Sequence, residues 1–143
     1  MRIAVQPEPF DQAEALRGFG GTAGAIVTFT GVVRDDTGRM QALELEHYPG
    51  MTERAITAIA GKAQARWSLS DVLVIHRYGR LAVGEQIMMV ATAARHRREA
   101  FEAAEFLMDF LKSRAPFWKK EIGPDGQSWV AAKDSDEDAL RRW

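Results

Sequence analysis

Residues 95–121 read RHRREAFEAAEFLMDFLKSRAPFWKKE and combine a basic segment, an apolar repeat and a proline. The apolar side chains recur at helical spacing and predict a long helix over about residues 97–114. Pro116 sets its end, because the residue before a proline avoids the α conformation. Residues 117–121 then predict a short strand. A long amphipathic helix followed directly by a strand indicates a fold in which helices pack against a sheet.

The rest of the chain contains more segments of both kinds. β-branched or alternating segments predict further strands at residues 2–6, 24–33, 42–48, 72–78, 85–93 and 128–132. Helices are expected after Asp11, from a cap at Thr52 to about Trp67, and at residues 134–141. The turn residues 35–38 predict that strands 24–33 and 42–48 form a hairpin.

These elements predict an α+β fold in a single domain spanning residues 1–143. We expect a mostly antiparallel sheet with two main helices packed on one face, similar to an α/β hammerhead. A chain of 143 residues fits one domain, and such a domain buries about two-thirds of its unfolded surface.

Composition narrows the classes of function. Hydrophobic residues make up 46% of the chain and charged residues 27%, as in ordinary soluble proteins. The formal net charge of −1 argues against a nucleic-acid partner, which usually requires a basic excess. No apolar run approaches the roughly 20 residues that span a membrane. The N-terminus also lacks the apolar core of a secretion signal, so we expect a cytoplasmic protein without a membrane partner.

The sequence contains no cysteine. Disulfides, thiolate metal sites and cysteine nucleophiles are therefore excluded. His47 and His76 each fall in a predicted strand without metal-ligand spacing, so we interpret both as structural and expect no metal site. If this chain handles sulfur, the sulfur must arrive on a partner.

Lys112 is the first candidate for chemistry. The apolar arc of the long helix is formed by Phe101, Ala104, Met108 and Leu111. Lys112 falls inside this arc, and Arg97 lies on the same side. Desolvation and nearby cations would lower the pKa of such a lysine and suit it to proton transfer near neutral pH. The alternatives are a lysine with a buried stem and a solvated head, or a pair with Glu105.

The strand after Pro116 offers further cations. Alternation places Lys119 and Glu121 on one face and Lys120 on the other. Lys119 can therefore join Lys112 at one site, with Glu121 orienting it. The alternative is an edge strand protected by lysines.

Three other cations are suited to an anionic ligand. His96 and Arg97 lie at the start of the long helix, where exposed N–H groups favour phosphate. Arg34 ends the strand 24–33. The alternatives are a solvated basic helix start and a pair between Arg34 and Asp35 or Asp36. Together the cations predict binding of a small phosphorylated ligand with proton movement around it.

Several long segments in the same order resemble one known family, the large subunit of molybdopterin synthase (MoaE family). They are GAIVTFTGVVR (24–34), LELEHYPGM (43–51), HRYGRLAVGE (76–85), HRREAFEAAEFLMDFLKSRAPFWKKE (96–121) and the final Arg142-Trp143. The resemblance covers nearly the whole chain from about residue 22.

This resemblance implies a sulfurtransferase of molybdenum cofactor biosynthesis. Two large subunits would form a central dimer, and each would bind a small ubiquitin-like sulfur-carrier subunit, giving a heterotetramer. The carrier's C-terminal Gly-Gly thiocarboxylate would enter a pocket of the large subunit. Two sulfur transfers to cyclic pyranopterin monophosphate (precursor Z) would then give molybdopterin, with no resident cofactor.

The resemblance also assigns roles to residues. Lys112 matches the main catalytic lysine, a general acid/base, and Lys119 matches the second lysine. Arg34, His96 and Arg97 match a site for the pterin phosphate, while Lys120 and Glu121 would contact the substrate or hold Lys119.

Two positions depart from the family pattern. Arg95 replaces a small residue, which would make the site more basic. Lys133 replaces an arginine that would reach across the dimer, and it lacks the bidentate fork of arginine.

Two other functions remain open at this point. The same cations could form a non-catalytic binding module for phosphate-bearing ligands or RNA, whose affinity would depend on salt. The chain could also be an inert scaffold that only pairs with the carrier subunit.

Overall fold

The computed structural model describes residues 1–143. Its strands are β1 (Arg2–Gln6), β2 (Ala25–Val32), β3 (Ala42–His47), β4 (Asp71–Arg77), β5 (Gly79–Ala82), β6 (Gln86–Ala94), β7 (Phe117–Gly123) and β8 (Gly126–Val130). Its helices are α1 (Gln12–Ala15), α2 (Met51–Trp67), α3 (Arg97–Ser113), α4 (Asp134–Ala139) and the 3-10 turn η1 (Leu140–Arg142). The α+β class expected from the sequence is confirmed.

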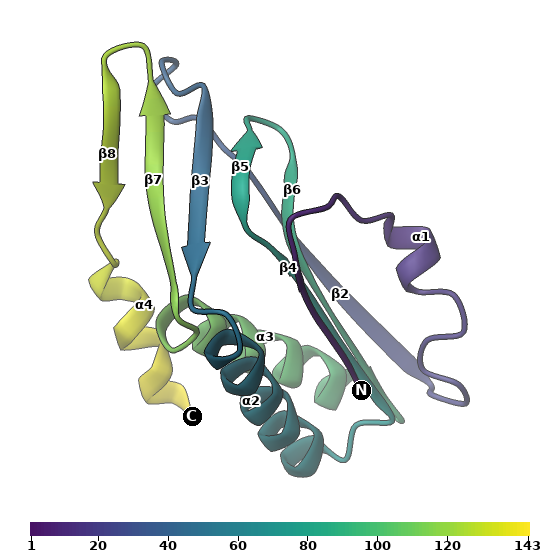
Figure 1. Cartoon of the computed structure of the whole chain (residues 1–143). Helices are drawn as coiled ribbons and strands as arrows, with labels where there is room; N and C mark the ends of the chain where they lie inside the picture. Colours follow the sequence, from purple (N-terminus) through teal and green to yellow (C-terminus); the bar gives the residue numbers. More distant parts are fainter.

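The first sheet has the strand order β1-β4-β6-β2, with β1 parallel to β4 and the other pairs antiparallel. Helices α2 and α3 lie side by side against one of its faces (Figure 1). The helices and strands on this side share one apolar core, which includes Ile56, Ala60, Ala63, Val72, Val74, Val90, Ala100, Ala103 and Leu107. The alanines bring the helices close together, because a short side chain leaves room for the neighbouring backbone.

The opposite face of the first sheet is also covered. Leu73, Ile75, Met89 and Ala91 form a second cluster, against which residues of the α1 region pack. Asp11 caps α1 as expected, since its carboxylate accepts a hydrogen bond from the Glu14 N–H at 2.9 Å. Strands β4 and β6 are therefore buried on both faces, which explains their nearly continuous apolar sequences.

The second sheet has the order β5-β3-β7-β8 and is antiparallel throughout. The expected hairpin between strands 24–33 and 42–48 is wrong, because β2 pairs with β6 whereas β3 pairs with β5 and β7. The segment between them turns around Asp35, whose carboxylate accepts hydrogen bonds from the N–H groups of Thr37, Gly38 and Met40. This turn carries the chain from one sheet to the other instead of closing a hairpin.

The start of α2 also differs from the expectation. Gly50, with a φ of +80°, is the N-cap instead of Thr52, and the Glu53 carboxylate accepts from its N–H at 2.7 Å. Glycine adopts this conformation without the cost that a Cβ imposes. Thr52 lies inside the first turn and is fully buried, and its hydroxyl donates to the Tyr48 carbonyl at 2.9 Å.

Arg77 ties three segments together from a buried position at the end of β4. Its guanidinium donates two hydrogen bonds to the Pro7 carbonyl, at 3.2 and 3.0 Å. It also donates to the Gln86 carbonyl at 3.1 Å and to the Glu85 carboxylate at 3.2 Å. Arg77 thereby holds the turn between β5 and β6 in place.

The C-terminal segment packs against α3. Trp143 lies edge-on to Trp67 and Phe106, and its indole N–H donates to the Asp109 carboxylate at 2.6 Å. Arg142 also donates to Asp109, at 2.5 Å. None of the helices combines the length and apolar character needed to cross a membrane.

Candidate active site

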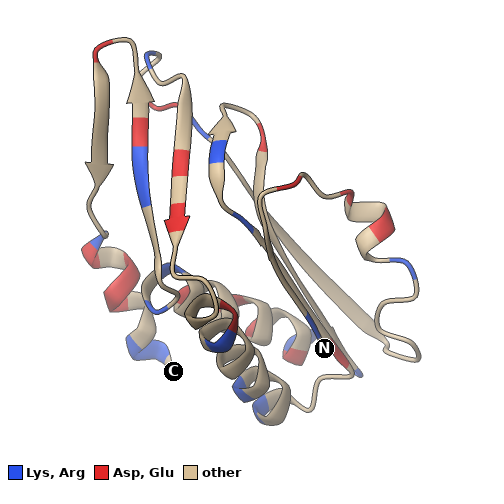
Figure 2. Cartoon of the chain, viewed as in Figure 1, with Lys and Arg blue, Asp and Glu red and all other residues tan.

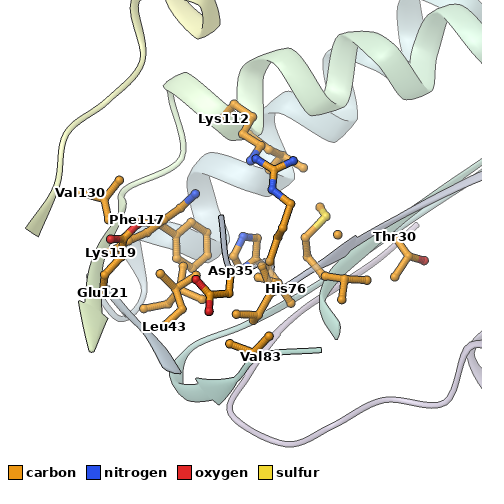
Figure 3. A pocket seen from close by; sticks show the side chains of 18 of the residues that line it. Thr30, Asp35, Leu43, His76, Val83, Lys112, Phe117, Lys119, Glu121 and Val130 are labelled. Carbon is orange, nitrogen blue, oxygen red and sulfur yellow. The ribbon is translucent and has the colours of Figure 1, made fainter. Parts of the chain in front are cut away.

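A cavity of about 880 Å³ opens between the two sheets near the C-terminal end of α3. Side chains from both sheets, from α3 and from the segment after β8 line it (Figure 3). Fourteen of its 25 lining residues are hydrophobic. The cavity therefore combines an apolar wall with a few charged groups, as small-molecule sites usually do.

Lys112 and Lys119 enter this cavity from different elements. Lys112 comes from the last turn of α3, and Lys119 comes from β7 (Figure 3). Pro116 separates the two elements, so the chain reverses and brings the lysines close together. Burial lowers the pKa of Lys119, and the positive charges of Lys112 and Lys133 lower it further, while the charge of Asp136 opposes them.

The burial of the two lysines differs from the sequence expectation. Lys112 is exposed, whereas Lys119 is half-buried. The buried face of α3 consists of Ala100, Ala103, Ala104, Phe106, Leu107 and Leu111. Phe101 is 61% exposed. The buried face of α3 is therefore rotated by about one residue around the helix from the predicted apolar arc. The desolvated lysine of this site is therefore Lys119.

Three further predicted residues line the same cavity. Arg34 does so two residues after the end of β2, and it forms an ion pair with Asp36 at 2.8 Å, as the alternative interpretation of the sequence predicted. Glu121 follows Lys119 on the same face of β7 and is exposed. Lys133 lines the cavity of its own chain, and the contact across a dimer that the family resemblance implies stays a prediction. The cavity thus contains four cations and several carboxylates.

His96 and Arg97 are not brought to this cavity within one chain. Both are exposed at the N-terminal end of α3. Lys112 lies fifteen residues further along the helix than Arg97, which corresponds to roughly 22 Å at 1.5 Å per residue. No side chain spans that distance, so these residues cannot share a ligand with Lys112 in the same protomer.

Lys120 also lies outside the cavity. It projects from the opposite face of β7, 3.4 Å from the Glu46 carboxylate and 4.4 Å from the centre of the Trp129 ring. Figure 2 shows the acidic positions of β3 beside the basic positions of β7. The structure therefore gives Lys120 partners within the second sheet.

Sequence reasoning missed His76 as a lining residue. The residue is 8% exposed, and its ring stacks on Phe117, with the ring centres 3.8 Å apart. Its Nδ1 lies 2.9 Å from the Arg77 carbonyl oxygen. Burial lowers the pKa of His76 to about 4, and the charges of Lys119, Lys112 and His47 act in the same direction. The ring is therefore neutral at pH 7.

Comparison with known proteins identifies the family to which this chain belongs. A family model described as "MoaE protein" matches residues 5–114. The chain belongs to the MoaE family. A MoaE relative from Cereibacter sphaeroides, named molybdopterin synthase catalytic subunit, is 64% identical over the full length of both chains.

Solved MoaE structures agree with this placement. The MoaE protein from Burkholderia ambifaria has a TM-score of 0.83 and 50% identity, covering 100% of this chain and 98% of that one. A structure from Helicobacter pylori, a complex of subunits 1 and 2 of molybdopterin-converting factor, has a TM-score of 0.76 at 20% identity. It covers 92% of this chain and 90% of that one, and it shows the shared fold.

Proposed function

We propose that this chain is the catalytic subunit of a molybdopterin synthase. It transfers two sulfurs from the C-terminal thiocarboxylate of a small ubiquitin-like carrier subunit to cyclic pyranopterin monophosphate. The observation that carries the proposal is the pair of lysines, Lys112 and Lys119, facing one partly apolar cavity. The full-length relatives that bear the catalytic-subunit name support the same assignment.

The lysine pair suits a reaction that moves protons around an anionic substrate. Burial and the charge of Lys112 lower the pKa of Lys119, which brings this lysine closer to the range in which a side chain exchanges protons with a substrate. Lys112 is exposed within the same cavity, where it can reach the substrate and the end of the carrier. Arg34 and Lys133 add positive charge for the phosphate.

The apolar part of the cavity suits the carrier tail. Leu43 and Leu45 line it from β3, and Met88 lines it from β6. A Gly-Gly tail has no side chains, so it fits between such walls as an extended backbone. The absence of cysteine from the chain fits sulfur that arrives on this tail. The subunit complex solved for the Helicobacter pylori protein supports a small-subunit partner.

A second copy of the chain supplies His96 and Arg97 in this proposal. These residues are too far from Lys112 to act in their own protomer, yet the family resemblance implies a role for them at the substrate phosphate. The edge strand β2 exposes Ile26, Phe29 and Val32, each more than 40% accessible. An apolar edge of this kind is suited to burial in a dimer.

Reconstitution tests the proposal. The purified chain is mixed with thiocarboxylated carrier and precursor Z, and the product is measured as the fluorescent oxidised pterin. We expect product with the native chain and at least a hundredfold loss with Lys112→Ala or Lys119→Ala, since general acid–base groups contribute about 10²–10⁴-fold. Lys62→Ala, which removes an exposed lysine of α2, is the matched control and should retain activity.

The outcomes separate the candidate functions. No product from a folded chain with active carrier would contradict the synthase assignment. Carrier binding without turnover would indicate a scaffold, and salt-dependent RNA binding without turnover would indicate a binding module.

A further inference from the structure

We propose that His76 is a specificity residue of the cavity, whose Nε2 accepts a hydrogen bond from an N–H group of the bound substrate. This inference rests on the proposed function and deepens it. A pterin carries ring N–H donors in addition to its phosphate. Protonated lysine and arginine side chains only donate hydrogen bonds, so they cannot recognise those donors.

The tautomer of His76 follows from its backbone partner. The Arg77 carbonyl oxygen, 2.9 Å from Nδ1, can only accept a hydrogen bond. Nδ1 must therefore carry the hydrogen. In a neutral imidazole the other nitrogen, Nε2, then bears the free lone pair.

Nε2 has access to the cavity. The only fully covered side-chain oxygen or nitrogen atoms without a partner belong to Glu99 and Ser113. Nε2 of His76 has no hydrogen-bond partner in the chain, so it is not one of the covered atoms. His76 lines the cavity (Figure 3), so we infer that the uncovered lone pair faces it.

The surroundings hold the ring in this state. Phe117 stacks on its face at an interplanar angle of 17°, which restricts rotation. The titratable groups that act on the ring are Lys119 from β7, Lys112 from α3 and His47 from β3, and all three oppose a positive charge on it. The Arg77 guanidinium is directed instead towards Pro7 and Glu85.

Other acceptors in the cavity are already engaged or lie at its rim. The Asp35 carboxylate accepts from the backbone of its own turn. Asp36 pairs with Arg34. Glu121 is exposed to solvent. The Thr30 hydroxyl accepts a hydrogen bond from the Gln12 side-chain amide. His76 is thus a buried, neutral side-chain acceptor whose Nε2 has no partner within the chain.

Two substitutions separate the lone pair from the packing of the ring. In His76→Asn the side-chain amide can still donate to the Arg77 carbonyl, but nothing replaces Nε2. In His76→Gln the longer amide places an acceptor near the former Nε2. Both variants lose the stacked ring, so the difference between them reports the acceptor. Their melting temperatures show whether each variant folds.

Calorimetry with precursor Z and, separately, with inorganic phosphate provides the readout. We expect His76→Asn to weaken precursor Z binding about tenfold, the usual effect of one lost hydrogen bond, and to leave phosphate binding within about twofold. His76→Gln should recover most of the loss. Equal precursor Z affinity in all three proteins would overturn the inference, and so would a parallel loss for phosphate.

Nitrogen NMR of the unsubstituted protein gives a second test that does not depend on variants. We expect the imidazole shifts of a neutral Nδ1–H ring at pH 7 and a change at Nε2 when precursor Z binds. An imidazolium, or an unchanged Nε2 signal in the complex, would overturn the inference. If the native chain turns over precursor Z while these tests fail, only the role of His76 is lost. If the native chain has no turnover, both proposals are lost.

Discussion

Replacing Arg77 with methionine removes the guanidinium that joins the end of β1 to the turn between β5 and β6. Methionine has a similar length and fills the buried space that the Arg77 side chain occupies. Four hydrogen bonds are lost, two to the Pro7 carbonyl and one each to Gln86 and Glu85. The substitution therefore tests how much these polar contacts contribute beyond packing.

The accessibility of the partners sets the size of the effect. The Glu85 side chain is 40% exposed and Pro7 lies at the surface, so water replaces Arg77 at both. We allow about 1 kcal/mol for each replaced contact. Gln86 is half-buried, so leaving its carbonyl without a hydrogen-bond partner costs somewhat more free energy. The sum is about 3 kcal/mol of unfolding free energy, or roughly 6–12 °C in melting temperature.

Urea unfolding followed by tryptophan fluorescence measures this loss. The midpoint should fall while the slope of free energy against urea stays the same, because the surface exposed on unfolding does not change. Arg80→Met, at an exposed arginine of β5, is the matched control and should change the midpoint little. A midpoint for Arg77→Met equal to that of Arg80→Met would refute the reasoning. Val83 and Gly84 of the same turn line the cavity, so KM for precursor Z should also rise.

Three other predictions follow from the site. Mixing inactive Lys112→Ala with inactive Arg97→Ala should restore about a quarter of native activity, because half of the dimers are mixed and each has one complete site; no recovery after subunit exchange would place Arg97 in its own protomer's site. Asp136→Asn removes a charge that raises the pKa of Lys119, so the rising limb of the pH–activity profile should move to lower pH; a shift to higher pH would contradict the assignment of that limb to Lys119. Because His76 has a pKa of about 4 when folded and an ordinary value of 6.5, the unfolded chain binds its proton first, and stability should fall as pH drops from 6.5 towards 4. In His76→Gln, urea unfolding at several pH values should show that unfolding takes up about one proton fewer across this range. An unchanged pH dependence would show that His76 does not contribute to it.

Local patterns were sufficient to predict most elements. The continuous apolar sequence of β4, the repeat in α3 and the stop before Pro116 each depend on residues near in sequence. The pairing of β2 with β6 was not predictable in this way, because partners in a sheet are selected by contacts between distant segments. The turn at Asp35 has the same residue types whether it closes a hairpin or joins two sheets.

The site was predicted in part. Lys119 and Lys112 were expected together, and the structure places them at one cavity. Their burial was not predictable, because the predicted apolar arc includes Phe101, whereas alanines form much of the buried face of α3. Alanine is common on exposed and buried helix faces alike, so it gives a weak signal. His76 was missed because β4 is buried on both faces, and alternation then carries no information about which side chain meets a cavity.

The two lysines belong to separate bodies of the fold. Lys112 is carried by the helix that packs on the first sheet, and Lys119 by a strand of the second. Their mutual repulsion therefore depends on how the sheets are spaced. If a ligand in the cavity increases the spacing of the sheets, the repulsion weakens and the pKa of Lys119 rises, so the protein would take up protons from the buffer. Ligand binding in the cavity would in this way be coupled to the protonation of Lys119, the lysine to which we assign proton transfer, with no separate sensor.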